Sequence, residues 1–278
     1  MILLAHDGSI YGDWLARYAL HFAAAEEDRQ LLALHVRDGR IPAERLASRW
    51  QRLEQEGAAA AVSCRLEVLR LRHGVAHSLL QAVPSGPPRL LLCGTRFRPR
   101  QQGFLTGSVA ETLLRNSQGP VLALRIVQPG LLGSPQSLLL PLTPPHCSLS
   151  PLEPLIRHLL PQLGVLHLFQ AVTVNRLRHV CLSATLEDEL RHKGHHQLAS
   201  IREKLETTFA PLPLRCDQRV TLTSDWAQEI LLQAHRLKSQ LLLLGLPRRA
   251  LIRRVLQRRA LETILRHTPC DVGIYPEP

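Results

Sequence analysis

An internal repeat is the feature that most constrains the fold of this 278-residue chain. Three positions near the end of the first half recur 151 residues later, without a gap. The pairs are Gly94 and Gly245, Glu111 and Glu262, and Val121 and Val272. The length of the chain also suggests two domains. We therefore predict that the chain folds as two copies of one domain.

Short apolar runs alternate with helical patterns along both halves. We expect strands at 2–6, 30–36, 65–71, 90–93, 121–124, 138–142, 165–174, 213–221, 240–244 and 272–275, and helices at 11–25, 42–62, 74–83, 108–115, 151–163, 187–209, 224–237 and from 260. This alternation predicts an α/β fold with two tandem Rossmann-like domains, each a five-stranded parallel sheet sandwiched by helices. The domains are expected at 1–128 and 136–278, because a linker rich in Pro and Gly spans 128–135.

The stretch 90–124 reads as strand, loop, helix and strand. Gly94 ends the first strand, and Gly107 precedes the helix. Ser108 suits an N-cap, and Glu111 completes a capping box. A helix N-terminus offers unpaired N–H groups and the positive end of its dipole, and glycines let the backbone approach a ligand closely. The stretch therefore predicts a phosphate site.

This stretch resembles the nucleotide loop of the universal stress protein family. ATP-binding members carry Gly, two residues, Gly, nine residues, then Gly and Ser or Thr; Gly94, Gly107 and Ser108 match, whereas Phe97 replaces the second glycine. The segment GSVAETLLR, followed by PVL, is also typical of the family. With RHTPCDVGI in the second half, the resemblance covers nearly the whole chain as a tandem pair with the family's fold, adenine nucleotide alpha hydrolase-like.

The resemblance implies a site for ATP, with or without Mg²⁺, in the first domain. In the family an Asp after the first strand contacts the nucleotide, and Asp7 matches it. A residue at the end of the second strand lies against the adenine, and Val36 matches it. The expected binding residues are Asp7, Gly8, Ser9, Val36, Cys93, Gly94, Gly107, Ser108 and Val109. From the residues alone, Asp7 also fits a helix cap, and Val36 fits an ordinary core valine.

The second copy departs from the nucleotide pattern. Arg258 and Arg259 replace Gly107 and Ser108, Arg248 replaces Phe97, and Thr143 with Pro144 replaces Asp7 and Gly8. We expect a degenerate domain that packs on the first one in place of a second subunit, with a homodimer of whole chains as a further option. Since the family's last strand often mediates pairing, 121–124 and 272–275 are the expected pairing edges.

Two other clusters suggest alternative functions. Segment 248–259 contains six arginines and no acid, beside an apolar stripe. It supports the alternative of an interaction scaffold that binds no nucleotide; a nucleic-acid role is not expected, because no recognised motif accompanies it. His192, His195 and His196 lie at metal-ligand spacing on a helix, but no Cys or acid completes the pattern. We expect no metal site there.

The remaining expectations concern chemistry and location. No residue pattern identifies a nucleophile with its base, so whether the protein is an enzyme is left open, with slow ATP hydrolysis at most. Six scattered cysteines without a CxxC pair argue against a zinc ribbon or a disulfide framework. No apolar run is long enough to cross a bilayer, and the first residues do not resemble a signal peptide. We expect a cytoplasmic stress-response regulator that acts on an unidentified protein partner.

Overall fold

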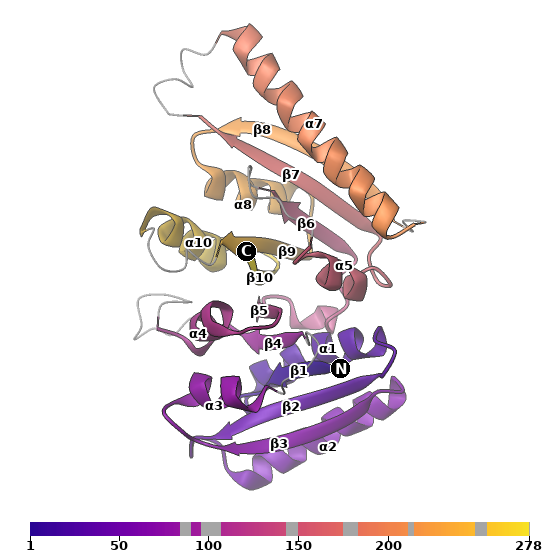
Figure 1. Ribbon diagram of the computed structural model, residues 1–278, viewed down its shortest axis with the longest axis vertical. Helices are drawn as coiled ribbons and strands as arrows, with labels where there is room; N and C mark the ends of the chain where they lie inside the picture. Colours follow the sequence, from indigo (N-terminus) through magenta and orange to yellow (C-terminus); the bar gives the residue numbers. More distant parts are fainter. Residues whose placement is uncertain are drawn as a thin grey trace.

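The structure is a computed structural model that describes residues 1–83, 90–95, 107–142, 150–174, 183–210, 214–247 and 255–277. In the last of these ranges, side chains are described from residue 259 onward. Both halves alternate strands and helices as expected (Figure 1). No helix of the described residues is long and apolar enough to span a membrane.

The described residues of the first half form five strands and four helices. They are β1 (Ile2–Ala5), α1 (Ile10–Ala24), β2 (Gln30–Arg37), α2 (Ala43–Ala59), β3 (Ser63–Arg70), α3 (Val75–Ala82), β4 (Leu91–Gly94), α4 (Val109–Asn116) and β5 (Val121–Arg125). A 3₁₀ turn, η1 (Pro129–Leu131), lies in the linker. These elements follow the predicted order.

The second half repeats this sequence of elements. They are β6 (Ser137–Pro141), α5 (Glu153–Leu159), β7 (Val165–Thr173), α7 (Ala184–Thr208), β8 (Arg215–Thr223), α8 (Trp226–Arg236), β9 (Leu241–Pro247), α10 (Val255–His267) and β10 (Asp271–Glu277). Helix α5 is shorter than the expected 151–163. Leu160 still has helical backbone angles after the last residue of α5, but Pro161 has no N–H with which to continue the helical hydrogen bonds.

All ten strands form one continuous sheet, in the order β3-β2-β1-β4-β5-β10-β9-β6-β7-β8. Within each half every neighbouring pair is parallel. The two halves share one strand order. Read from each outer edge toward the middle, the first half has the order β3-β2-β1-β4-β5 and the second half has the equivalent order β8-β7-β6-β9-β10. The predicted five-stranded parallel sheets are therefore confirmed, although they are joined edge to edge.

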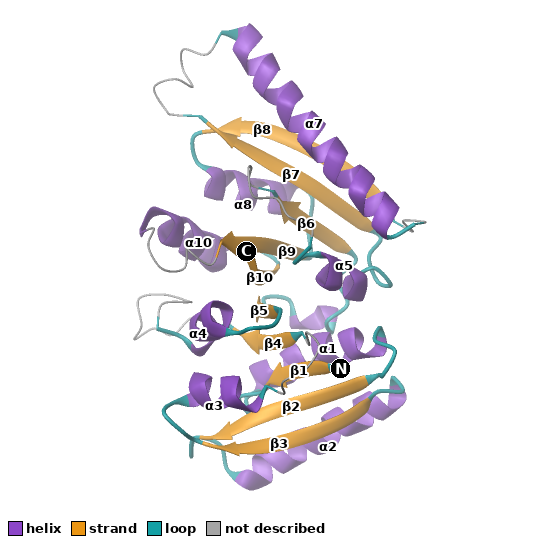
Figure 2. Ribbon diagram, viewed as in Figure 1, coloured by secondary structure: helices purple, strands orange, loops and turns teal. Residues whose placement is uncertain are grey.

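Helices cover both faces of this sheet (Figure 2). Because side chains alternate along a strand, Leu4 faces a core with α1, α2, α5 and α7, and Leu3 faces a core with α3, α4, α8 and α10. Each core runs through both halves. The burial of apolar strands on both faces is the reason that the sequence reads as continuous apolar runs.

The halves meet where β5 pairs with β10, and among the described strand pairs this one alone is antiparallel. The two expected pairing edges thus pair with each other, with Leu124 opposite Gly273. A side chain at Gly273 would place its Cβ 2.5 Å from Leu243 Cδ2 and 3.0 Å from Leu122 Cδ1. Glycine at this position therefore lets leucines of both halves pack over the β5–β10 pair, which we call the seam.

A buried carboxylate also holds the halves together. Asp271, at the start of β10, is fully buried and accepts hydrogen bonds from Tyr18 Oη of α1 at 2.7 Å, Val127 N at 2.7 Å and Gln128 N at 2.8 Å. Burial raises the pKa of Asp271 and, together with the nearby carboxylate, that of Tyr18. These three donors join the second half to α1 and to the linker.

Candidate functional site

A pocket of about 200 Å³ lies at the carboxyl ends of β1, β2 and β4 in the first half. Ligands of open α/β sheets bind at this edge. Seven of the nine predicted binding residues line it: Asp7, Ser9, Val36, Cys93, Gly94, Ser108 and Val109. Gly8 and Gly107 do not line it themselves, but each adjoins a residue that does. The fold thus brings together segments that lie far apart in the sequence.

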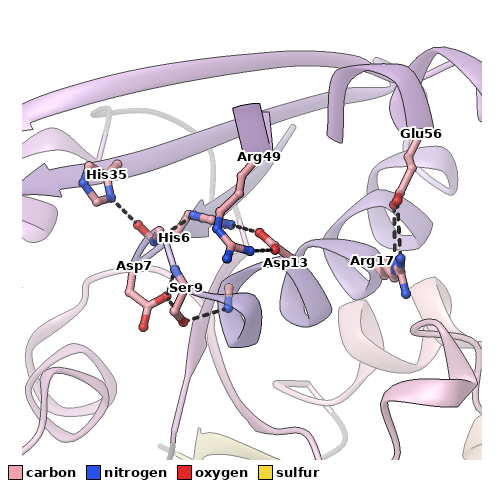
Figure 3. A network of polar contacts seen from close by, with 10 residues as sticks. His6, Asp7, Ser9, Asp13, Arg17, His35, Arg49 and Glu56 are labelled. Carbon is pink, nitrogen blue, oxygen red and sulfur yellow. Dashed lines mark hydrogen bonds and ion pairs between the residues drawn. The ribbon is translucent and has the colours of Figure 1, made fainter. Parts of the chain in front are cut away.

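The β1–α1 loop forms one wall of the pocket (Figure 3). Asp7 is exposed, and its Oδ1 accepts hydrogen bonds from Ser9 N at 2.9 Å and Ser9 Oγ at 2.6 Å. Ser9, not Asp7, is the N-cap of α1 and accepts from Gly12 N. Gly8 has a φ of +76°, which glycine adopts without strain. Asp7 therefore orients the cap residue and keeps its carboxylate at the pocket.

The N-terminus of α4 forms the opposite wall. Ser108 is its N-cap and accepts from Glu111 N at 3.1 Å, as predicted. The buried Glu111 carboxylate reaches back to Gly107 N at 2.7 Å, and Arg115 Nη2 lies 3.4 Å from its other oxygen. The capping box is confirmed, with the acid bonded one residue before the N-cap. An N–H near this helix start is therefore already satisfied by the protein.

Between these walls the pocket is mostly apolar. Val36 is 5% exposed, and Ile41 and Leu79 lie beside it in the lining. Cys93 contributes a buried thiol whose pKa burial raises to about 12. That thiol stays protonated at neutral pH, so it acts as apolar wall and not as a nucleophile. Such a surface suits the flat face of a base.

Thr95 and His35 are lining residues that the sequence analysis did not single out. The Thr95 hydroxyl is buried and has no hydrogen-bond partner among the described residues. A buried hydroxyl without a partner is costly, so it fits a site in which a ligand supplies the partner. The position of Thr95, directly after Gly94 at a strand end, was the signal that could have found it.

The corresponding place in the second half is filled. A Cβ on Gly245 would lie 2.0 Å from Glu277 Oε1 and 2.7 Å from Tyr275 Oη, whereas one on Gly94 would meet, among the described residues, only Leu15 Cδ2 at 3.7 Å. Helix α10 begins at Val255 and therefore includes Arg259, which is the counterpart of the N-cap Ser108. The position that would offer free N–H groups in a second site is thus inside a helix.

Other predicted features lie partly outside the described residues. Phe97, Thr143, Pro144 and Arg248 are all outside them, as are the side chains of 248–258 in the arginine-rich segment; Arg259 is exposed. His192, His195 and His196 are exposed on α7, with Nε2 of His192 and His196 3.0 Å apart. Across the described ranges, no group of three or more potential metal ligands occurs.

Comparison with known proteins gives one family and several structures. Residues 1–125 match the sequence profile of the universal stress protein family. The comparison with curated protein sequences gave no match. A universal stress protein from Archaeoglobus fulgidus superposes with a TM-score of 0.57 at 14% identity, over 99% of this chain and 96% of that chain.

Two further solved structures also match 99% of this chain. A functionally unknown protein from Pseudomonas aeruginosa has a TM-score of 0.57 and 18% identity over 92% of its length. The cytoplasmic domain of a prokaryotic cation chloride cotransporter has a TM-score of 0.60 and 11% identity over 93% of its length. Identities this low show a shared fold.

Proposed function

We propose that this chain, whose residues 1–125 match the universal stress protein family, is a stress-response regulator that binds ATP or another adenine nucleotide in its first half. The observation that carries the proposal is the pocket, whose lining contains seven of the binding residues expected from the family resemblance. The unpartnered Thr95 hydroxyl adds a polar group that a ligand could satisfy. The nucleotide state would alter a surface that another protein reads.

The proposed roles follow from the chemistry of each wall. Asp7 accepts hydrogen bonds from ribose hydroxyls, and Val36 packs against the adenine. Ser108 and the first N–H groups of α4 donate to phosphate oxygens, which the positive end of the helix dipole also attracts. Mg²⁺ would accompany the phosphates, because hard cations prefer oxygen ligands. Gly94 leaves room for the backbone to approach the ligand.

We also propose that residues 136–278 are a second domain of the same type that has lost the site. The shared strand order and the covered Gly245 support this assignment. The domain would occupy the place of a second subunit, since its last strand pairs with that of the first half. No observation on the described residues favours the scaffold alternative based on 248–259.

The proposal is tested by nucleotide content and affinity. Released adenine nucleotide is measured after denaturing the purified protein, and ATP is then titrated by calorimetry with and without Mg²⁺. We expect one site per chain, lost in Asp7→Ala and in Ser108→Arg, which copies the second half. Glu203→Ala and Ser200→Arg, both at exposed positions of α7, are matched controls and should bind normally. No released nucleotide and no heat up to about 1 mM ATP would contradict the proposal.

A further inference from the structure

A buried histidine lies directly beneath the β1–α1 loop. His6 is 5% exposed and immediately precedes Asp7. Its Nδ1 lies 3.0 Å from Gly8 N, and its Nε2 lies 3.3 Å from Asp13 Oδ1 on α1 (Figure 3). The other oxygen of Asp13 contacts Arg49 Nη1 of α2. One imidazole therefore connects the loop to two helices.

The partners of His6 define its protonation state. A backbone N–H can only donate, so Nδ1 must be without a proton where it meets Gly8. The ring proton then lies on Nε2 and points at the Asp13 carboxylate. A second proton on Nδ1 would place two donors against each other at this short distance. The loop shape seen here thus requires neutral His6.

From this geometry we infer that His6 is a positioning residue whose neutral form holds the Asp7–Ser9 turn in its binding shape and whose protonation releases it. The inference rests on the proposed nucleotide site, because Asp7 and Ser9 line that pocket. Nucleotide affinity should consequently fall as the pH falls. A neutral histidine gains its proton near neutral pH more readily than any other side chain.

The β1–α1 loop is closely packed on both sides of His6. A Cβ on Gly12 would lie 2.9 Å from His6 Nε2 and 3.0 Å from Asp7 Oδ1. A Cβ on Gly8 would lie 3.0 Å from Ile41 Cγ1. Since ring, turn and helix are this close, a conflict between two donors would push the turn away from the ring.

Four charged or titratable groups face this network from the packed elements. Asp13 of α1 places a carboxylate beside Nε2 of His6, and Arg49 of α2 contacts the other oxygen of that carboxylate. His35 of β2 donates from Nδ1 to the His6 carbonyl oxygen at 2.9 Å, and Asp7 is bonded to Ser9. The second half has Leu142 at the position of His6, where each residue donates its N–H to the neighbouring strand. Leu142 carries no imidazole, so the described residues of the second half show no equivalent of the His6 contacts.

The test compares two substitutions of His6. In His6→Asn, a carboxamide oxygen replaces Nδ1 as acceptor but does not titrate; His6→Leu copies the second half and removes the acceptor. We expect wild-type ATP affinity to fall about tenfold more than that of His6→Asn between about pH 8 and pH 5.5. His6→Asn should bind like the wild type at the higher pH, and His6→Leu about tenfold more weakly at both. His77→Asn, at an exposed histidine, is the matched control and should keep the wild-type pH profile.

A measurement without nucleotide separates the two proposals. Nitrogen NMR of the ligand-free protein should show His6 as the Nε2–H tautomer, and the Gly8 amide should lose exchange protection when His6 is protonated. An Nδ1–H tautomer, unchanged Gly8 protection, or parallel pH profiles for the wild type and His6→Asn would overturn the role of His6. If the wild type binds no nucleotide at about pH 8, the proposed function fails instead, and the tautomer and Gly8 protection still decide the inference.

Discussion

The two halves share one strand order, yet their equivalent glycines lie in opposite surroundings. Gly94 borders an open pocket, and Gly245 lies under the Glu277 carboxylate and the Tyr275 hydroxyl. The difference arises at element ends: β10 has seven residues where β5 has five, and α10 begins earlier than α4 relative to the repeat. A few residues at the ends of elements can therefore fill a pocket while the core and the strand order stay the same.

The largest loss of stability should come from removing the Asp271 carboxylate, which connects the second half to the first. Asp271→Ala removes the acceptor of Tyr18 Oη and two backbone N–H groups. Leaving these buried donors unsatisfied should lower the free energy of unfolding by about 3–5 kcal/mol. Urea denaturation measures this loss, with the exposed Glu203→Ala as the control. A loss below about 1 kcal/mol would show that the seam does not depend on this carboxylate.

Alanine at the two equivalent glycines sharpens the comparison directly. Gly245→Ala must displace Glu277 or Tyr275, so it should cost about 1–3 kcal/mol in unfolding free energy. Gly94→Ala meets only Leu15 at ordinary contact distance and should leave stability unchanged or raise it by about 0.5 kcal/mol. Its methyl group should instead weaken ATP binding about tenfold. Equal stability losses in both variants would contradict the assignment of an open and a filled site.

Removing one unpartnered hydroxyl from each half should give a smaller, stabilising effect. Both Thr95 Oγ1 and Ser239 Oγ are buried without a partner among the described residues. Thr95→Val and Ser239→Ala should each raise the free energy of unfolding by about 1 kcal/mol, measured by thermal and urea denaturation. Only Thr95→Val should also weaken ATP binding. Normal binding by that variant would exclude the Thr95 hydroxyl from the site.

The smallest effect concerns the pH dependence of the seam. Burial raises the pKa of Asp271 in the folded state. The folded state therefore binds a proton at this carboxyl more tightly than the unfolded chain does, and protonation stabilises the fold. The stabilisation by the protonated Asp271 carboxyl is fully present below the pKa that this group has in the unfolded chain. It is lost as the pH rises through the pKa of the folded state. The excess stability of the wild type over Asp271→Asn should therefore shrink as pH rises from about 3 to about 7. A difference that grows with pH would show that the three donors outweigh burial.

Much of the fold could be read from the sequence, because its signals are local. Apolar runs marked the strands, and the capping pattern of Ser108 and Glu111 correctly placed the start of α4. The set of binding residues came from the family resemblance, and seven of nine line one pocket. Helix ends were less exact, as α5 shows, since end positions depend on neighbouring prolines as well as on apolar periodicity.

Other features depend on contacts between residues distant in sequence. The hydrogen bond from Tyr18 to Asp271, the position of the Glu277 carboxylate over Gly245, and the contact of Arg49 with Asp13 all join residues from different elements. A periodic pattern shows which face of an element is apolar, but not which polar group will lie opposite. These pairings therefore have no signal in a single sequence.

The sequence by itself predicted the class of the fold and the repeated order of its elements, and the family resemblance supplied the candidate binding residues. It could do so because hydrophobic periodicity and capping act over a few residues, and because the repeat preserves spacing. Only the tertiary structure decided that the two sheets join through β5 and β10. It also decided that one half keeps an open pocket and the other fills it. A single sequence could not show this, because strand register across the seam and the burial of single carboxylates depend on how the two halves pack together.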